Sequence, residues 1–281
     1  MKRIILVRHG QNSMVGKRLA GWLPGVHLNE VGQAQAAALA ERLGKQKGDI
    51  KALYSSPVTR CQETARPIAE ALGLEVQHLD GVSEVRYGEW EGKSIAELAQ
   101  LDEWKIVQRF PSAMRFPQGE KMRDVQMRAI EAVEEVAESL NDNESAIIVS
   151  HADLIKSIAA HYAGVHFDLF QRLVISAASI TIIGLTRYGP RLICLNDCAH
   201  VPAGKDPELP SASKETINKS IISFCPTITF CNCFFIKYTL SCNSETSILF
   251  SKAMFSETSL LFCSSILLFI QEIFYHFIKY N

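Results

Sequence analysis

The chain has 281 residues, 47% of them hydrophobic, and a formal net charge of −1 at pH 7. This length suffices for one large α/β domain with a full core. The balanced charge argues against a nucleic-acid partner, because such proteins carry a strongly basic face. The start Met-Lys-Arg leads directly into an apolar run and leaves no visible signal peptide, so we expect a cytoplasmic protein.

The first predicted element is a buried strand at residues 4–7 that ends in Arg8, His9 and Gly10. The run is short, apolar and β-branched, which is typical of a central parallel strand. Ligands bind beyond the carboxyl ends of such strands. His9 is therefore predicted to lie at the floor of a site, where its imidazole can be delivered to an anion.

A second strand, predicted at residues 53–55, turns at Ser-Pro into a helix. We place Pro57 in the first helical turn, where its missing N–H costs nothing. Arg60 then lies on the opening turn, where backbone donors and the helix dipole favour an anion. Its guanidinium can hold two phosphate oxygens, so Arg60 is a candidate phosphate ligand.

The segment 81–92 is rich in glycine and aromatic residues and has no helical or strand periodicity, which indicates a structured loop. A carboxyl group beside a phosphate site can give a proton to a leaving oxygen and later take one from water. Glu84, Glu89 and Glu91 are all available on sequence alone. We choose Glu84.

A further apolar strand, predicted at residues 147–150, ends in His151. Because the carboxyl ends of parallel strands meet at one edge of a sheet, we expect His9, His151, Arg8 and Arg60 to form a basic pocket. Neither a His pair with metal-ligand spacing on one helix face nor a Cys-x-x-Cys motif is present. We therefore expect no metal and no cofactor.

Predicted strands and helices alternate along residues 1–204, as in a sheet covered on both faces. This pattern predicts an α/β fold, a three-layer sandwich with a mostly parallel central sheet. The other expected elements are strands at 76–79, 179–185 and 192–195, a helix capped by Asn29 that runs to Leu43 before Gly44 ends it, and helices at 119–140 and 153–162.

The composition changes after Gly204. Residues 205–281 contain no Gly, Arg or Val and hold five of the eight cysteines. We predict a domain at 1–204 and an atypical tail at 205–281 that is not part of its fold. Read-through into AT-rich DNA would explain this tail. A membrane anchor at 259–280 is the alternative, but polar residues shorten its apolar stretch below the roughly 20 residues that a span requires, so we do not expect it.

Four motifs occur in order along the chain: Arg-His-Gly, Ser-Pro-x-x-Arg-x-x-x-Thr-Ala, Glu-x-x-Tyr-Gly-x-x-Glu-Gly and Val-Ser-His. With this set, residues 2–196 resemble the histidine phosphatase superfamily, which contains phosphoglycerate mutases and many phosphomonoesterases. The similarity is greatest to bacterial members known as probable phosphomutases or phosphatases. The resemblance implies a phosphoglycerate mutase-like fold, with the nucleophile at His9, phosphate ligands at Arg8, Arg60 and His151, and the proton donor at Glu84.

The sequence departs from the family pattern at three positions. Val15 stands where many members have a phosphate-binding Asn, and we expect Asn12, in the same loop, to supply that amide. Val85 replaces the Arg with which mutases recognise a substrate carboxylate. Ala152 replaces a Gly, and a positive φ at that position would tilt His151.

The resemblance implies a metal-independent hydrolase that cleaves small phosphorylated metabolites through a phosphohistidine. His9 is expected to be neutral and His151 charged. Mutase chemistry is the alternative among enzymes, but the chain lacks the mutase insertion that excludes water, which favours hydrolysis. A catalytically silent phosphate-binding module is the alternative outside enzymes, and Val15 and Ala152 keep it open.

Overall fold

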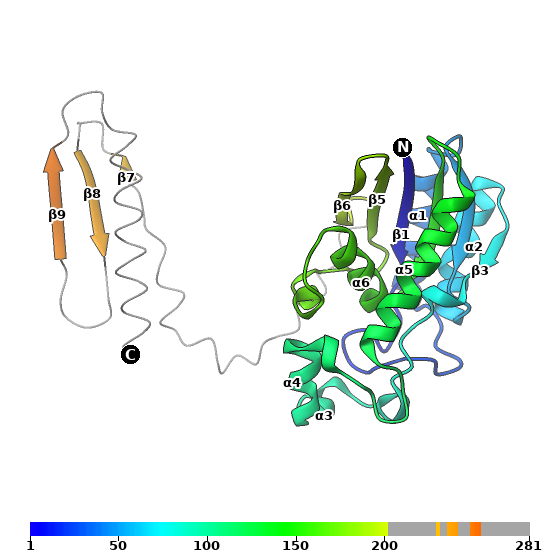
Figure 1. Cartoon of the computed structure of the whole chain (residues 1–281), viewed down its shortest axis with the longest axis horizontal. Coiled ribbons are helices and arrows are strands. Elements are labelled where there is room, and N and C mark those ends of the chain that lie inside the picture. The colour runs from blue at the N-terminus through cyan, green and yellow to red at the C-terminus, as the bar shows by residue number, and fades with distance from the viewer. Residues whose placement is uncertain (202–228, 231–234, 241–247, 254–281) are drawn as a thin grey trace. The chain divides into compact units, whose positions relative to one another are not determined.

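A computed structural model describes residues 1–201, 229–230, 235–240 and 248–253 (Figure 1). The chain divides into two compact units, Met1–Pro210 and Ser211–Asn281. In the second unit, β7 (Thr229–Phe230), β8 (Phe235–Leu240) and β9 (Ile248–Ala253) form an antiparallel sheet in this order.

The boundary predicted at Gly204 and the anchor considered at 259–280 lie outside the described residues. In the part of the chain that the structure describes, no helix is long and apolar enough to cross a membrane.

The first unit is built on a six-stranded sheet in the order β3-β2-β4-β1-β5-β6. Strands β1 to β4 are mutually parallel, whereas β5 pairs antiparallel with β1 and β6 antiparallel with β5. The strands are β1 (Lys2–Arg8), β2 (Ile50–Ser55), β3 (Val76–His78), β4 (Ser145–Ser150), β5 (Ile180–Thr186) and β6 (Gly189–Asp197). The predicted α/β class and mostly parallel sheet are confirmed.

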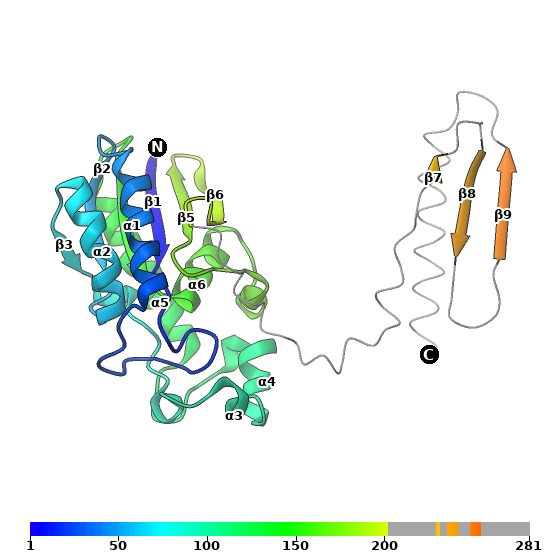
Figure 2. The same cartoon turned by 180° about the vertical axis from the view of Figure 1, so that it is seen from behind.

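Helices cover both faces of this sheet. Figures 1 and 2 show α5 (Met122–Ser139) and α6 (Ala152–Tyr162) on one face and α1 (Glu30–Gly44) and α2 (Thr59–Leu72) on the other. Successive side chains of a strand point to opposite faces. Accordingly, Ile4 and Leu6 of β1 pack in the core under α5 and α6, while Ile5 and Val7 pack under α1 and α2. The predicted three-layer sandwich is confirmed.

The helix after β1 begins and ends close to the predicted positions. Asn29 caps α1, because its side chain accepts the N–H of Gly32 at 2.8 Å. The prediction that Gly44 ends this helix is off by one residue, since Gly44 is the last helical residue.

The prediction that Pro57 lies in the first helical turn is wrong. Val58 is the N-cap of α2 and keeps an extended conformation, with φ −68° and ψ 136°, so the helix begins only at Thr59. Arg60 nevertheless lies on the opening turn, as predicted.

Between β3 and α5 the chain forms a segment beyond the carboxyl end of β1 (Figures 1 and 2). This segment contains α3 (Ile95–Leu98), α4 (Asp102–Arg109) and the 3-10 turns η1 (Asp80–Val82), η2 (Gly88–Trp90) and η3 (Pro111–Ala113), while η4 (Phe167–Arg172) follows α6.

Backbone hydrogen bonds join the two ends of the part that holds α3 and α4. The N–H of Glu89 donates to the carbonyl of Pro117, and the N–H of Glu120 to that of Arg86, each at 2.9 Å. A Cβ on Gly88 would lie 2.1 Å from the Pro117 carbonyl oxygen, so only glycine fits there.

Replacing Ile148 by alanine should destabilise the domain, because this side chain is fully buried in the central strand β4. We expect a loss of about 2–5 kcal/mol in the free energy of unfolding, measured by denaturant titration. Val31→Ala on α1 is the control, since Val31 is 52% exposed and its truncation should change stability by no more than about 0.5 kcal/mol. Equal losses in the two variants would contradict this account of the core.

Candidate active site

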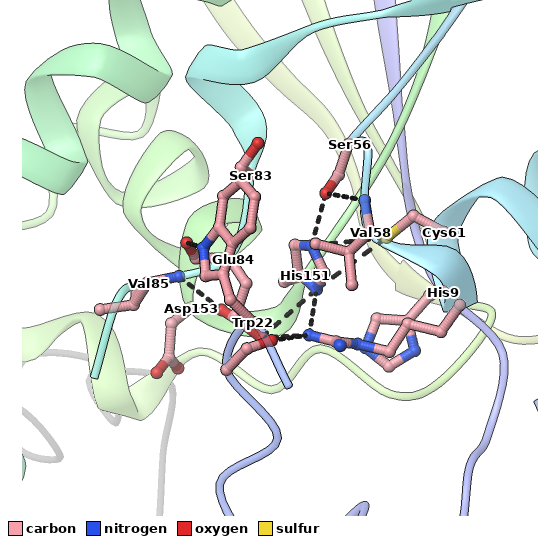
Figure 3. Close-up of polar contacts among 12 residues, drawn as sticks. His9, Trp22, Ser56, Val58, Cys61, Ser83, Glu84, Val85, His151 and Asp153 are labelled. Atoms are coloured by element: carbon pink, nitrogen blue, oxygen red, sulfur yellow. Dashed lines mark hydrogen bonds and ion pairs between the residues drawn. The ribbon is translucent and has the colours of Figure 1, made fainter. Parts of the chain in front are cut away.

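The strands β1 and β4 bring the two strand-end histidines together. Their parallel register pairs Arg8 with Ser150, and the N–H of His9 donates to the carbonyl of Ser150 at 3.0 Å. The imidazoles of His9 and His151 are therefore neighbours, with ring centroids 5.3 Å apart (Figure 3). Both residues are buried.

The contacts of His9 determine which ring nitrogen can react. Nδ1 lies 2.7 Å from the carbonyl of Gly10, which can only accept, so Nδ1 carries the proton and Nε2 keeps the lone pair. Nε of Arg60 donates to Nε2 at 3.3 Å. Burial, followed by the charges of Arg60 and Arg8, lowers the pKa of His9 well below 6.5. His9 is thus neutral, as predicted.

Arg60 connects the two histidines to the glutamate. Its side chain is 1% exposed, and its Nη2 lies 3.2 Å from Nδ1 of His151 and 3.3 Å from Oε2 of Glu84. The same nitrogen donates to the carbonyl of Gly21 at 3.0 Å. On the other side of the ring, Nε2 of His151 lies 2.9 Å from Oγ of Ser56.

Two buried guanidinium nitrogens have no hydrogen-bond partner among the described residues: Nη1 of Arg60 and Nε of Arg8. The other edge of Arg8 is held by its Nη1, which donates to the carbonyl of Ile175 at 2.7 Å. Leaving a donor buried without an acceptor costs about 1–3 kcal/mol. The oxygens of a bound phosphate would offset this cost.

Among the three candidate carboxyl groups, only Glu84 joins the histidines. Glu89 is exposed and Glu91 is half-buried. The carboxyl of Glu84 is almost fully buried, and its Oε2 lies 3.3 Å from Nδ1 of His151. Its Oε1 accepts the N–H of Val85 at 3.0 Å.

The pKa of Glu84 is raised from 4.5 to about 7. Burial is the largest cause, because it penalises the charged form. Arg60 lowers the pKa and Asp153 raises it, each by less than burial does. Glu84 therefore exchanges a proton near neutral pH, as a general acid and base must.

His151 differs from expectation in two respects. The expectation that it is charged is wrong for this structure, because burial and then the charge of Arg60 lower its pKa well below 6.5. Ala152 does not have a positive φ, since it is the first residue of α6. The tilt considered for His151 therefore has no cause at this position.

Asn12 is buried in the loop after β1, but its side chain has a local partner. The amide oxygen accepts the N–H groups of Met14 and Val15 at 2.9 and 3.1 Å. It thereby holds a turn of the loop. A role of Asn12 in phosphate binding stays a prediction.

Several supporting residues escaped the sequence reasoning. Thr64 accepts the N–H of Gly10 at 3.0 Å and donates to the carbonyl of Arg60 at 2.8 Å, so it ties the loop behind His9 to helix α2. Its place in the Ser-Pro motif was the available signal. Trp22 donates its indole N–H to the carbonyl of Glu84 at 2.8 Å, and no spacing in the sequence indicates that contact.

Within the described residues, no three His, Cys, Asp or Glu side chains are arranged to hold a metal ion. The thiol of Cys61 lies 3.5 Å from Nε2 of His151, and burial raises its pKa to about 12. Cys61 therefore stays protonated beneath the histidine at neutral pH.

Comparison with known proteins identifies the family of this chain. The sequence model of the histidine phosphatase superfamily (branch 1) matches residues 4–198, well over half of the chain. The chain belongs to the histidine phosphatase superfamily. This confirms the resemblance seen in the four motifs, and the chain is a phosphatase of this superfamily.

Curated relatives of this phosphatase cover most of its first unit. Phosphoserine phosphatase 1 of Hydrogenobacter thermophilus is 30% identical over 205 residues, which are 72% of this chain and 95% of that protein. The metal-independent phosphoserine phosphatase of Arabidopsis thaliana is 32% identical over 160 residues, 55% of this chain and 66% of that protein. The structure of mycobacterial glucosyl-3-phosphoglycerate phosphatase with VO3 has 27% identity and a TM-score of 0.63, and the match covers 70% of this chain and 99% of that one.

Replacing Arg60 by methionine should weaken the binding of inorganic phosphate by about 10- to 100-fold, because hydrogen bonds to charged groups contribute about 1.5–3 kcal/mol. Isothermal titration calorimetry on the full chain measures this change. Arg66→Met, at an exposed position of the same helix, is the matched control and should bind phosphate like the unmodified protein. A similar loss in both variants would show that Arg60 has no special role.

Proposed function

We propose that the protein hydrolyses phosphomonoesters of small metabolites without a metal ion, through a phosphohistidine formed on His9. The observation that carries this proposal is the neutral His9, whose Nε2 lone pair faces Arg60 beside two buried guanidinium nitrogens that lack an acceptor among the described residues. Family membership supports it. The substrate class follows the named activities of the relatives, which include phosphatases for phosphoserine and glucosyl-3-phosphoglycerate.

In the first half-reaction, Nε2 of His9 attacks phosphorus and the bond to the leaving oxygen breaks. Arg8, Arg60 and His151 stabilise the charge on the other phosphate oxygens, a form of catalysis that consists of positioning and electrostatics. Glu84, in its protonated form, donates its proton to the leaving oxygen. The products are the free alcohol and the phosphohistidine.

In the second half-reaction, water attacks the phosphohistidine and the bond from phosphorus to Nε2 breaks. Glu84, now a carboxylate, takes a proton from that water, and His9 returns to its neutral form. A pKa of about 7 keeps both forms of Glu84 accessible near neutral pH, which supports its use as acid and then as base.

The environment of Val85 supports hydrolysis over mutase chemistry. Its side chain is fully buried in the core beside α5, so it cannot contact the carboxylate of a substrate. The position that holds an Arg in mutases is thus both apolar and turned inward. The phosphoenzyme is then expected to lose its phosphate to water rather than to a retained intermediate.

Replacing His9 by alanine should abolish phosphate release, because Nε2 of His9 is the atom that attacks phosphorus in the proposed reaction. We expect at least a ~1,000-fold loss of turnover of p-nitrophenyl phosphate by the full chain in EDTA. The unmodified protein should also form an acid-labile, base-stable phosphoenzyme that the variant lacks. The control is His27→Ala, a loop histidine with a 61% exposed side chain that pairs with Glu63.

Each other outcome of this experiment selects a different function. Turnover that persists in His9→Ala at the unmodified rate would refute the phosphohistidine. Phosphate binding without any turnover would identify a silent binding module. Isomerisation of a phosphoglycerate with little free phosphate would identify a mutase.

The activity should depend on pH through Glu84. For an alkyl phosphate, kcat/KM should be high below pH 7 and fall as pH rises, because burial raises the pKa of Glu84 to about 7 and only the protonated form can donate. Glu84→Gln should remove this descending limb and lower kcat/KM by about 100-fold or more. Glu89→Gln, at an exposed position of the same loop, should keep the limb. A limb that survives in Glu84→Gln would assign the proton to another group.

A further inference from the structure

Glu84 lies between η1 and η2 on a stretch without regular secondary structure, so other contacts must fix its backbone. Nη1 of Arg128 donates to the carbonyls of Gly81 and Ser83 at 2.7 and 2.8 Å. Nη2 of Arg128 donates to the carbonyl of Glu84 at 3.2 Å. One guanidinium on helix α5 thus holds three carbonyl groups of the loop that carries the proton donor.

A carboxylate fixes the remaining edge of this guanidinium. Glu120 accepts from Nε of Arg128 at 2.9 Å and from Nη2 at 3.0 Å. A guanidinium has five N–H donors, and these contacts provide an acceptor for each of them. The same carboxylate accepts the N–H of Arg86 at 2.8 Å. Arg128 and Glu120 together hold the loop on both sides of Glu84.

Helix α5, which carries Arg128, is fixed by its packing in the core. Val125, Ala129 and Ala132 of α5 are buried in the core. A Cβ on Gly81 would lie 2.6 Å from Cβ of Ala132 and 2.8 Å from the carbonyl oxygen of Arg128, so the loop backbone lies directly against the helix. The loop therefore takes its position from α5.

We propose that Arg128, held by Glu120, is a positioning residue that places the carboxyl of Glu84 for proton transfer. The inference rests on the proposed function, in which Glu84 protonates the leaving oxygen. Arg128 contacts the backbone carbonyl of Glu84, whereas the carboxyl contacts Arg60 and His151. Arg128 therefore acts on the proton donor by fixing the position of the Glu84 backbone. A misplacement of about 1 Å can cost on the order of 100-fold in rate.

Leaving groups of different basicity separate this role from a general one. An alkyl phosphate needs a proton on its leaving oxygen, whereas p-nitrophenolate leaves without one. The ratio kcat/KM reports on the steps from free enzyme and free substrate up to and including the first irreversible step. Loss of a correctly placed donor should therefore lower kcat/KM for glycerol 2-phosphate and spare kcat/KM for p-nitrophenyl phosphate.

The experiment compares Arg128→Gln and Arg128→Lys in the full chain on these two substrates. For Arg128→Gln we expect kcat/KM to fall about 10- to 100-fold on glycerol 2-phosphate and to stay within about threefold on p-nitrophenyl phosphate. Arg128→Lys keeps a charged donor and should lose less on glycerol 2-phosphate. Arg123→Gln, at an exposed position of the same helix, is the matched control and should leave both values unchanged.

Equal losses on both substrates, or no loss on either, would overturn the inference. Glu120→Gln is the milder second variant, and it should show the same selectivity for glycerol 2-phosphate if Arg128→Gln fails to fold. Glu84→Gln, measured in parallel, separates the two proposals. If Glu84→Gln lowers kcat/KM equally on both substrates, the assignment of Glu84 as proton donor is wrong. If Glu84→Gln lowers kcat/KM mainly on glycerol 2-phosphate and the Arg128 variants do not, only the positioning role of Arg128 is refuted.

Discussion

The buried guanidinium of Arg60 is the group on which the arrangement of this site depends. It contacts both histidines and the carboxyl of Glu84, and it donates to a carbonyl of the loop after β1. These partners come from separate parts of the chain, so a single cation at the start of α2 joins them. An always-charged, planar group suits this place, because each N–H has a fixed direction and none can be lost to titration.

Burial acts on the nucleophile and the proton donor in opposite directions. It penalises the charged form of each group, so it lowers the pKa of His9 and raises that of Glu84. The arginines reinforce the first shift and oppose the second. One physical cause, exclusion from water, thus yields a neutral imidazole and a protonated carboxyl together. These are the two protonation states from which phosphoryl transfer to His9 can start.

The sequence allowed the strands and the strand-end residues to be predicted for a clear reason. Apolar runs that end abruptly in His9 and His151 mark both the strand and its functional end, and parallel pairing then brings the two histidines together. The wrong details were local. Pro57 was placed in the first helical turn, but it precedes the N-cap Val58, which remains extended. The charge of His151 was mistaken because its complete burial is not visible in the sequence.

The residues that sequence reasoning missed act through backbone groups. Arg128 contacts carbonyls that lie 44 to 47 positions earlier in the chain, and no spacing rule connects a helix residue to the carbonyls of an irregular loop. The amide of Asn12 shows the same difficulty on a local scale. Its residue type suits phosphate, yet two neighbouring N–H groups take its oxygen. Side-chain identity therefore predicted which residues carry the chemistry, but it did not predict which residues hold them in place.

The contacts between residues 86–89 and 117–120 close the base of the segment that holds α3 and α4. Because the two ends of this segment are joined at Gly88, a change in its length or sequence need not move the backbone on either side. The segment lies beyond the carboxyl end of β1, where ligands enter sheets of this kind. The joined ends thus separate the α3–α4 segment from the stretch that carries Glu84, so the segment can change in length without moving the carboxyl of Glu84.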